Sequence, residues 1–199
     1  MQLHNLFPTA VAMFDLGRDL TGAEKDFLLN LPQHANMGNT TSDDNEVLTR
    51  PEMSDLNAFM QASVQEYLTT VYAPKNEMHL RITQSWTNYT KPGQFHHKHA
   101  HPNSFVSGVF YIQTQNDTDR IYFYRDGYQT IKLPTDKWNV YNSESWWFEA
   151  TQGRLILFPS SLTHMVEAVK GESTRISMSF NTFPVGHIGD DRALTGLYL

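Results

Sequence analysis

The stretch TRISMSFN, residues 174–181, alternates polar and apolar side chains without a break. Successive side chains of a β-strand point to opposite faces, so this pattern predicts a strand with one apolar and one polar face. The apolar face would carry Ile176, Met178 and Phe180, and the polar face Arg175, Ser177, Ser179 and Asn181.

Seven runs upstream of this stretch are also predicted to be short strands. Turn signals such as Asp126-Gly127 and Lys170-Gly171 separate several of them. The runs cover residues 79–89, 105–113, 120–124, 129–133, 146–150, 154–158 and 164–169. A double-sheet jelly roll is the simplest closed arrangement for this many antiparallel strands.

The first eighty residues are predicted to be helical instead. Thr21 is a suitable N-cap for a short helix, and residues 36–46 form a polar, turn-rich segment that predicts a loop. Pro51 fits the first turn of a second helix, in which apolar residues recur every three or four positions from Met53 to Val71. The fold class is therefore α+β, and we expect one domain over residues 1–199. Its helical part would cover about 1–77 and its barrel about 78–185.

Composition and charge exclude several function classes. The chain has 199 residues, no Cys and a formal net charge of −6. The absence of Cys excludes thiol catalysis and Cys-ligated zinc, and fits a reducing cytoplasm. Without a basic stripe, nucleic acid is not expected as a partner. No apolar run is long enough to span a bilayer and no secretory signal is visible, so we expect a cytoplasmic protein.

Histidines gather in FHHKHAHP, residues 95–102. If this segment is an extended strand, His97, His99 and His101 share one face and His96 points to the other. Residues two apart on a strand are about 6.6 Å apart, which lets two imidazoles approach one ion. Imidazole suits Fe, Zn, Cu and Ni, so the cluster predicts a metal site without selecting the metal.

A metal site in a jelly roll needs a further ligand from elsewhere in the chain. His164 is the best candidate, because it follows an apolar strand and a turn and begins another strand. Eleven residues later, Arg175 and Ser177 lie on one strand face. A guanidinium binds a carboxylate through two hydrogen bonds, and a neighbouring hydroxyl can donate to the same group. This pair is suited to hold a dicarboxylic co-substrate beside the metal.

Four stretches of the chain resemble a known family. They are QSWTNYT at 84–90, HAHPNSFVSGVFY at 99–111, GRLILFPSSLTH at 153–164 and RISMSFN at 175–181. In this order they resemble the 2-oxoglutarate-Fe(II) oxygenases of bacteria and of phages of marine bacteria, over roughly half of the chain. The resemblance implies a double-stranded β-helix, a jelly-roll or cupin-like barrel, with the N-terminal helices packed on it. For a phage protein, the compartment would be the host cytoplasm.

The resemblance also implies roles for individual residues. His99, His101 and His164 would be the catalytic Fe(II) ligands, while Arg175, with Ser177 beside it, would bind the distal carboxylate of the co-substrate 2-oxoglutarate. Tyr111 and Asn88 are further candidates for co-substrate binding, as is Asn181.

The ligand set departs from the common one of two His and one carboxylate, because no Asp or Glu lies between residues 95 and 104. The pair His97 and His99 satisfies strand parity equally well and stays open as an alternative to His99 and His101.

Three functions remain open at this point. The first is an Fe(II)- and 2-oxoglutarate-dependent dioxygenase that hydroxylates a protein, peptide or small molecule and releases succinate and CO2. The second is a cupin-type three-His metalloenzyme that does not use 2-oxoglutarate. The third is a non-catalytic jelly-roll binding module. The apolar C-terminal residues 194–199 would pack either on their own domain or on a second subunit, which would form a homodimer.

Overall fold

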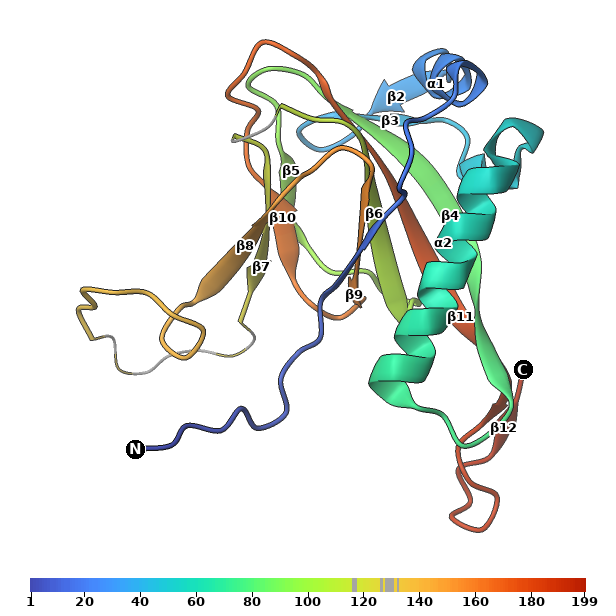
Figure 1. Cartoon of the computed structure of the whole chain (residues 1–199), viewed down its shortest axis with the longest axis vertical. Coiled ribbons are helices and arrows are strands. Elements are labelled where there is room, and N and C mark those ends of the chain that lie inside the picture. The colour runs from blue at the N-terminus through green and yellow to red at the C-terminus, as the bar shows by residue number, and fades with distance from the viewer. Residues whose placement is uncertain (116–117, 126, 128–130, 132) are drawn as a thin grey trace.

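The computed structural model describes residues 1–115, 118–125, 127, 131 and 133–199. In this part of the chain, two antiparallel sheets form the barrel (Figure 1). The larger sheet has the order β1-β9-β6-β11-β4-β3-β2, with β12 paired to β11, and the smaller has the order β5-β10-β7-β8. The architecture is the predicted jelly roll.

Most strand bounds agree with the predicted runs, but β10 ends at Val166 rather than at residue 169, and β11 continues to Ile188. The larger sheet contains β1 (Ala12–Asp15), β2 (Gln33–Ala35), β3 (Thr40–Ser42), β4 (Met78–Thr90), β6 (Val106–Gln113), β9 (Arg154–Pro159), β11 (Arg175–Ile188) and β12 (Leu197–Tyr198). The smaller sheet contains β5 (His96–His99), β7 (Arg120–Tyr124), β8 (Ser145–Glu149) and β10 (His164–Val166). The strand predicted at 129–133 falls mostly on residues outside the described part.

The alternation of β11 divides its side chains between two environments. Ile176, Met178 and Phe180 are buried in the core beneath the N-terminal helices, as predicted. On its opposite face, Arg175 and Ser177 line a cavity inside the barrel. A second apolar cluster, which includes Ile156 and Phe158 of β9, fills the space between the two sheets. β11 therefore contributes apolar side chains to the core beneath the helices and polar side chains to the cavity inside the barrel.

Helices cover the outer face of the larger sheet. α1 (Gly22–Leu29) begins at Thr21, whose hydroxyl accepts from the Glu24 N–H while the Glu24 carboxylate accepts from the Thr21 N–H. Two 3-10 turns, η1 (Val47–Thr49) and η2 (Pro51–Met53), precede α2 (Ser54–Tyr67), and one π-helical turn, η3 (Leu68–Tyr72), ends it. The apolar face of α2 packs on the sheet, on the side away from β5 and β10 (Figure 1).

The region before residue 78 also contains strands, which corrects its prediction as helical. β1 pairs with β9, and β3 pairs with β4, so both extend the larger sheet. β3 lies inside the segment 36–46 that was predicted to be a loop. These strands are short and lie at or near sheet edges, where alternation need not be strong. Their pairing partners lie far away in the sequence.

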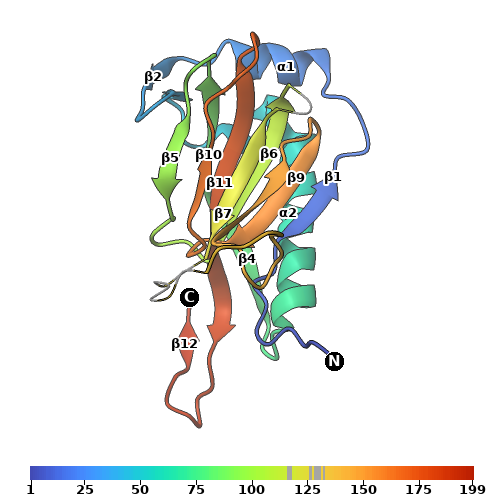
Figure 2. The same ribbon diagram turned by 90° about the vertical axis from the view of Figure 1, so that its left-hand side faces the viewer.

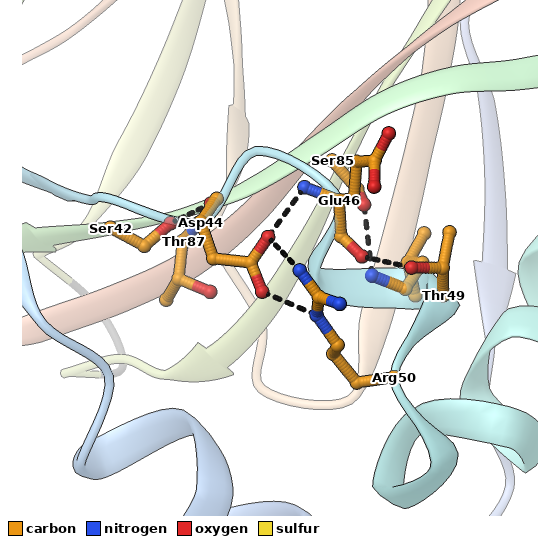
Figure 3. Close-up of polar contacts among 8 residues, drawn as sticks. Ser42, Asp44, Glu46, Thr49, Arg50, Ser85 and Thr87 are labelled. Atoms are coloured by element: carbon orange, nitrogen blue, oxygen red, sulfur yellow. Dashed lines mark hydrogen bonds and ion pairs between the residues drawn. The ribbon is translucent and has the colours of Figure 1, made fainter.

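Polar contacts attach β3 and the segment that follows it to β4; in that segment, the Leu48 N–H donates to Ser85 Oγ at 2.9 Å. Ser42 Oγ accepts from the Thr87 N–H of β4 at 3.0 Å. Arg50 donates two hydrogen bonds, of 2.7 and 3.0 Å, to the Asp44 carboxylate and thereby closes the loop onto itself (Figure 3). The attachment fixes one wall of the barrel mouth, because Ser42 also lines the groove at that opening.

The C-terminal hairpin of β11 and β12 projects beyond the body of the barrel (Figure 2). Among the described residues, no helix combines the length and the apolar character that crossing a bilayer would need.

Candidate active site

β5 and β10 bring the predicted metal ligands together. His164 lies directly opposite His99 in the antiparallel pair. His101 lies just after β5, where its backbone N–H donates to the Ser160 carbonyl at 2.9 Å. The ligand atoms of His99, His101 and His164 all lie within 4.8 Å of one another. These three residues, here called the His triad, therefore converge as the resemblance implied.

The outward-facing nitrogen of each triad imidazole is held by an oxygen acceptor. His99 Nδ1 donates to the His97 carbonyl at 2.7 Å, and His164 Nδ1 donates to the Leu162 carbonyl at 3.0 Å. Carbonyl oxygens can only accept, so both rings carry their proton on Nδ1. His101 Nδ1 lies 2.6 Å from the Asn181 side-chain oxygen. This arrangement leaves the Nε2 lone pairs free for a metal, as in most histidine metal sites.

The spacing of the Nε2 atoms fits a shared cation. His99 Nε2 and His101 Nε2 are 3.0 Å apart. With the protons on Nδ1, the two lone pairs face each other without a hydrogen between them, which is unfavourable unless a cation lies there. Two nitrogens that each lie about 2.1 Å from one ion at a right angle are about 3.0 Å apart. The triad therefore fits a divalent transition metal such as Fe(II).

Burial lowers the pKa of all three residues of the His triad and keeps them neutral. Desolvation, assisted by neighbouring imidazoles, lowers the pKa of His164 to about 3 and that of His99 to about 4. The pKa of His101 is also lowered, chiefly by desolvation. Metal binding requires neutral imidazole, so these ligands need no deprotonation near pH 7.

A β-bulge corrects the predicted facing of His96 and His97. Between the paired positions of β5 and β10 the register shifts, so that Val166 lies opposite His96 and His164 lies opposite His99. A bulge breaks the strict alternation of faces. His96 lines the interior cavity together with His99, whereas His97 lines only the groove at the mouth. The prediction that His96 would point away from the other histidines was wrong.

The interior cavity continues from the triad to a polar row that crosses three strands. Ser177 of β11 lies opposite Asn88 of β4 on one side and opposite Tyr111 of β6 on the other. All three line the cavity, as does Arg175, two residues from Ser177 on the same strand. The predicted co-substrate residues therefore share one cavity with the triad.

Two polar atoms of this row are buried without a hydrogen-bond partner in the described part of the chain. They are Tyr111 Oη and Asn88 Oδ1. Buried polar atoms are normally paired, so an orphaned pair inside a cavity is typical of a ligand site. Burial raises the pKa of Tyr111, which therefore remains a hydroxyl donor at neutral pH.

Arg175 has a partner that sequence reasoning missed. Its Nη1 donates to Asp119 Oδ1 at 3.0 Å, and both side chains are almost completely buried. The second carboxylate oxygen of Asp119 accepts from the Gln115 N–H at 2.8 Å. Asp119 lies just before β7, and no local pattern in the sequence marks it as the partner of Arg175.

Asn181 contacts the predicted metal ligand His101 and does not line the interior cavity. Besides the contact with His101, its side-chain oxygen accepts from Ser107 Oγ at 3.0 Å. Ser107 Oγ in turn lies 2.7 Å from Ser160 Oγ. This buried network fixes the orientation of the His101 ring. The expectation that Asn181 contacts the co-substrate stays untested, but its side chain lines the groove at the mouth and not the interior cavity.

A wide groove lies over the triad at the barrel mouth. It is lined by residues from the β2–β3 hairpin, β4, β5 and β11, including Asp43, Arg81, Trp86, His97 and Phe183. Both charges and aromatic rings are therefore available to a substrate that approaches the metal.

Comparisons with solved structures agree with this fold. A 2OG-Fe(II) oxygenase family oxidoreductase from Burkholderia pseudomallei is 15% identical, with a TM-score of 0.57, covering 79% of this chain and 74% of that one. HygX from Streptomyces hygroscopicus, solved with nickel, 2-oxoglutarate and hygromycin B, is 13% identical, with a TM-score of 0.59 and coverage of 87% and 82%. A Pseudomonas putida prolyl-4-hydroxylase is 13% identical, with a TM-score of 0.53 and coverage of 87% and 92%.

These identities establish the fold alone, and no curated protein matches the chain. The family comes from a sequence match. Residues 84–181, which carry the triad, Asn88, Tyr111, Asp119 and Arg175, match the family described as "Putative 2OG-Fe(II) oxygenase". The match spans just under half of the chain, and it identifies the segment that carries the site as similar to the 2OG-Fe(II) oxygenases, whose metal and co-substrate are Fe(II) and 2-oxoglutarate.

Proposed function

We propose that this protein is an Fe(II)- and 2-oxoglutarate-dependent dioxygenase that hydroxylates a C–H bond of its substrate. In the balanced reaction, 2-oxoglutarate, O2 and substrate give succinate, CO2 and hydroxylated substrate. The observation that supports it most strongly is that the His triad and Arg175 line the same buried cavity. A metal and a dicarboxylate could therefore be held next to each other.

The roles follow from the contacts. His99, His101 and His164 would hold Fe(II) through Nε2. Arg175 and Ser177 would bind the distal carboxylate of 2-oxoglutarate, with the orphaned Tyr111 Oη as a further donor. Asn88 donates its amide hydrogen to Ser179 Oγ at 3.1 Å and would present its free oxygen to the co-substrate pocket. When bound, Fe(II) supplies the O2 and one-electron chemistry that side chains cannot perform.

The substrate would enter through the groove at the mouth, where a protein, peptide or small molecule could reach the metal. Residues 1–199 would act as one unit, because α2 packs on the barrel through β4 and β9. The net charge of −6 argues against nucleic acid as a substrate. A homodimer through the exposed C-terminal residues Leu194, Leu197 and Leu199 remains part of the proposal.

An anaerobic titration tests this function. Metal-free protein receives Fe(II) and then 2-oxoglutarate, while the visible metal-to-ligand charge-transfer band is recorded. We expect the band to saturate near one equivalent and to be lost in His164→Ala and Arg175→Ala. His79→Ala serves as a matched control, because His79 is exposed and lies outside the cavity.

The three neutral ligands favour one alternative, a cupin-type metalloenzyme that does not use 2-oxoglutarate. Stoichiometric iron without a band, together with activity that survives Arg175→Ala, would support it and reject our proposal. Substoichiometric metal in untagged protein would support a non-catalytic binding module.

A further inference from the structure

His96 is the one member of the β5 histidine cluster that lines the interior cavity without belonging to the His triad. The β5 bulge directs it inward, and its ring stacks on His99 with 4.7 Å between centroids and 20° between planes. Neither ring nitrogen of His96 forms a hydrogen bond to the part of the chain that the structure describes. It therefore presents an unused polar edge beside the proposed metal.

A metal held by His96, His97 and His99 is the obvious competing explanation, since their ligand atoms also lie within 4.8 Å of one another. This set would share His99 with the triad. The Nδ1 of His99 already donates to the His97 carbonyl, so His99 has one nitrogen left to give. The triad has an oxygen acceptor on every Nδ1, whereas His97 Nδ1 is buried without a partner in the described chain. The contacts therefore favour the triad as the metal site and leave His96 free.

An uncharged N–H donor in this cavity would help to bind the carboxylates of 2-oxoglutarate. 2-Oxoglutarate carries two carboxylates, and the positive charge of Arg175 is already balanced by Asp119 at 3.0 Å. A neutral imidazole carries one N–H and can donate it to a carboxylate without adding charge. His96 and Arg175 line the same cavity, so one small dicarboxylate could contact both.

We propose that His96 is a co-substrate-binding residue whose ring N–H donates to a carboxylate oxygen of 2-oxoglutarate. This inference rests on the proposed function, because it needs 2-oxoglutarate in the cavity. It assigns His96 a contact with the co-substrate and none with the metal.

The test compares His96→Phe with His97→Phe. Phenylalanine keeps a flat ring that can stack on His99 and removes the N–H, while His97 is the neighbouring imidazole that lines only the mouth groove. Each protein is loaded anaerobically with Fe(II), and the Kd for 2-oxoglutarate is read from the charge-transfer band. We expect His96→Phe to bind one equivalent of Fe(II) and to raise the Kd about 10- to 100-fold, as for loss of a hydrogen bond to a charged group. His97→Phe should stay within about twofold of the parent protein.

A second variant covers the case in which His96→Phe fails to fold. His96→Gln retains a side-chain N–H donor, so its Kd for 2-oxoglutarate should lie between the Kd of the parent protein and the roughly 10- to 100-fold higher value expected without a donor. An unchanged Kd in His96→Phe, with a raised Kd in Arg175→Ala, would reject the role of His96 and leave the proposed function intact. Failure of both His96→Phe and His97→Phe to bind one equivalent of Fe(II) would reject the role of His96. It would favour a metal site formed by His96, His97 and His99. Absence of 2-oxoglutarate binding in the parent protein would reject both proposals.

Discussion

Asp119 and Arg175 form an ion pair enclosed within the barrel, with 3.0 Å between Oδ1 and Nη1 and side-chain exposures of 2% and 3%. Asp119 lies just before β7 in the smaller sheet, and Arg175 begins β11 in the larger one. The pair therefore connects the two sheets beside the cavity that Arg175 lines. A buried charge is tolerated only when it is paired, so each member depends on the other.

Replacement of Asp119 by Ala should strongly destabilise the protein. It leaves the Arg175 charge buried and unpaired, which typically costs about 3–5 kcal/mol. Urea denaturation of the metal-free protein measures the change in the free energy of unfolding. Asp15→Ala is the matched control, because Asp15 pairs with Arg154 at 2.8 Å but is 66% exposed, and such pairs contribute about 1 kcal/mol or less. Equal losses in the two variants would show that the buried pair has no special importance.

Gly108 of β6 lies opposite Phe180 of β11, and a methyl group at this position would overlap the Phe180 ring. We expect Gly108→Ala to lower stability by about 1–3 kcal/mol, or Tm by about 2–12 °C for a chain of this size. Thermal unfolding measures the shift. Gly22→Ala is the control, since nothing lies within 4 Å of the added atom there. The Gly108→Ala, Phe180→Leu double variant should be more stable than Gly108→Ala, and a further loss would contradict overlap as the cause.

The parts of the fold that depend on local periodicity could be predicted from the sequence. The alternation over residues 174–181 correctly predicted that Ile176, Met178 and Phe180 enter the apolar core, and that Arg175, Ser177 and Ser179 lie on the opposite face, which lines the cavity. The second helix followed from the spacing of its apolar residues, because burial of one helix face imposes that spacing. The grouping of His99, His101 and His164 was expected from the family resemblance, whereas strand alternation alone left His97 and His99 open as the proximal pair. The metal-binding role of the His triad stays a prediction.

The features that sequence reasoning missed arise from non-local pairing. The bulge that turns His96 inward arises only when β5 pairs with β10. The alternation of faces along a regular strand therefore predicted the wrong side for His96. The pairing of Asp119 with Arg175 joins residues 56 positions apart and leaves no local pattern. β3 is polar and short, and its strand character comes from its pairing with β4.

The choice between His101 and His97 as a metal ligand can be measured directly. His101→Ala removes an Nε2 atom from the triad and should lower Fe(II) affinity by more than 100-fold. His97→Ala should change the affinity less than about threefold, because the triad remains complete. Anaerobic calorimetry with Fe(II) provides both values. The reverse order of effects would assign the metal to His97 and His99.

Asn181 should contribute to metal affinity without touching the metal. Asn181→Leu removes the oxygen that lies 2.6 Å from His101 Nδ1, and loss of such a partner typically lowers metal affinity about 10- to 100-fold. Ser107 Oγ, 3.1 Å from the same nitrogen, can accept in its place, so we expect the lower end of this range. Thr83→Val is the control, because Thr83 Oγ1 donates to the backbone carbonyl of Asn181 and not to its side chain. The same Fe(II) calorimetry decides the outcome, and an unchanged affinity would exclude this positioning role.

The metal-free protein should lose stability as the pH falls below about 6.5. Burial lowers the pKa of His96 and of His164 to about 3, and that of His99 to about 4. In the unfolded chain these imidazoles have a pKa of about 6.5, so the unfolded state takes up protons first as the pH falls. Stability is therefore fully present above about pH 6.5 and decreases through the window down to about pH 3–4. Within this window each imidazole costs at most about 1.4 kcal/mol per pH unit.

Urea denaturation of the metal-free protein at pH 7.5, 6.5, 5.5 and 4.5 measures this slope. A His96→Phe, His164→Leu variant has two fewer depressed imidazoles and should show a clearly shallower slope over the same window. The surface pair His34 and Asp43 offers a control, since His34 is exposed and His34→Ala should leave the slope near that of the parent protein. Asp and Glu carboxyl groups titrate mainly below pH 5, so the interval from pH 6.5 to 5.5 reports most directly on the histidines. A flat profile in that interval would mean that the histidine cluster is hydrated and protonated in the folded, metal-free protein.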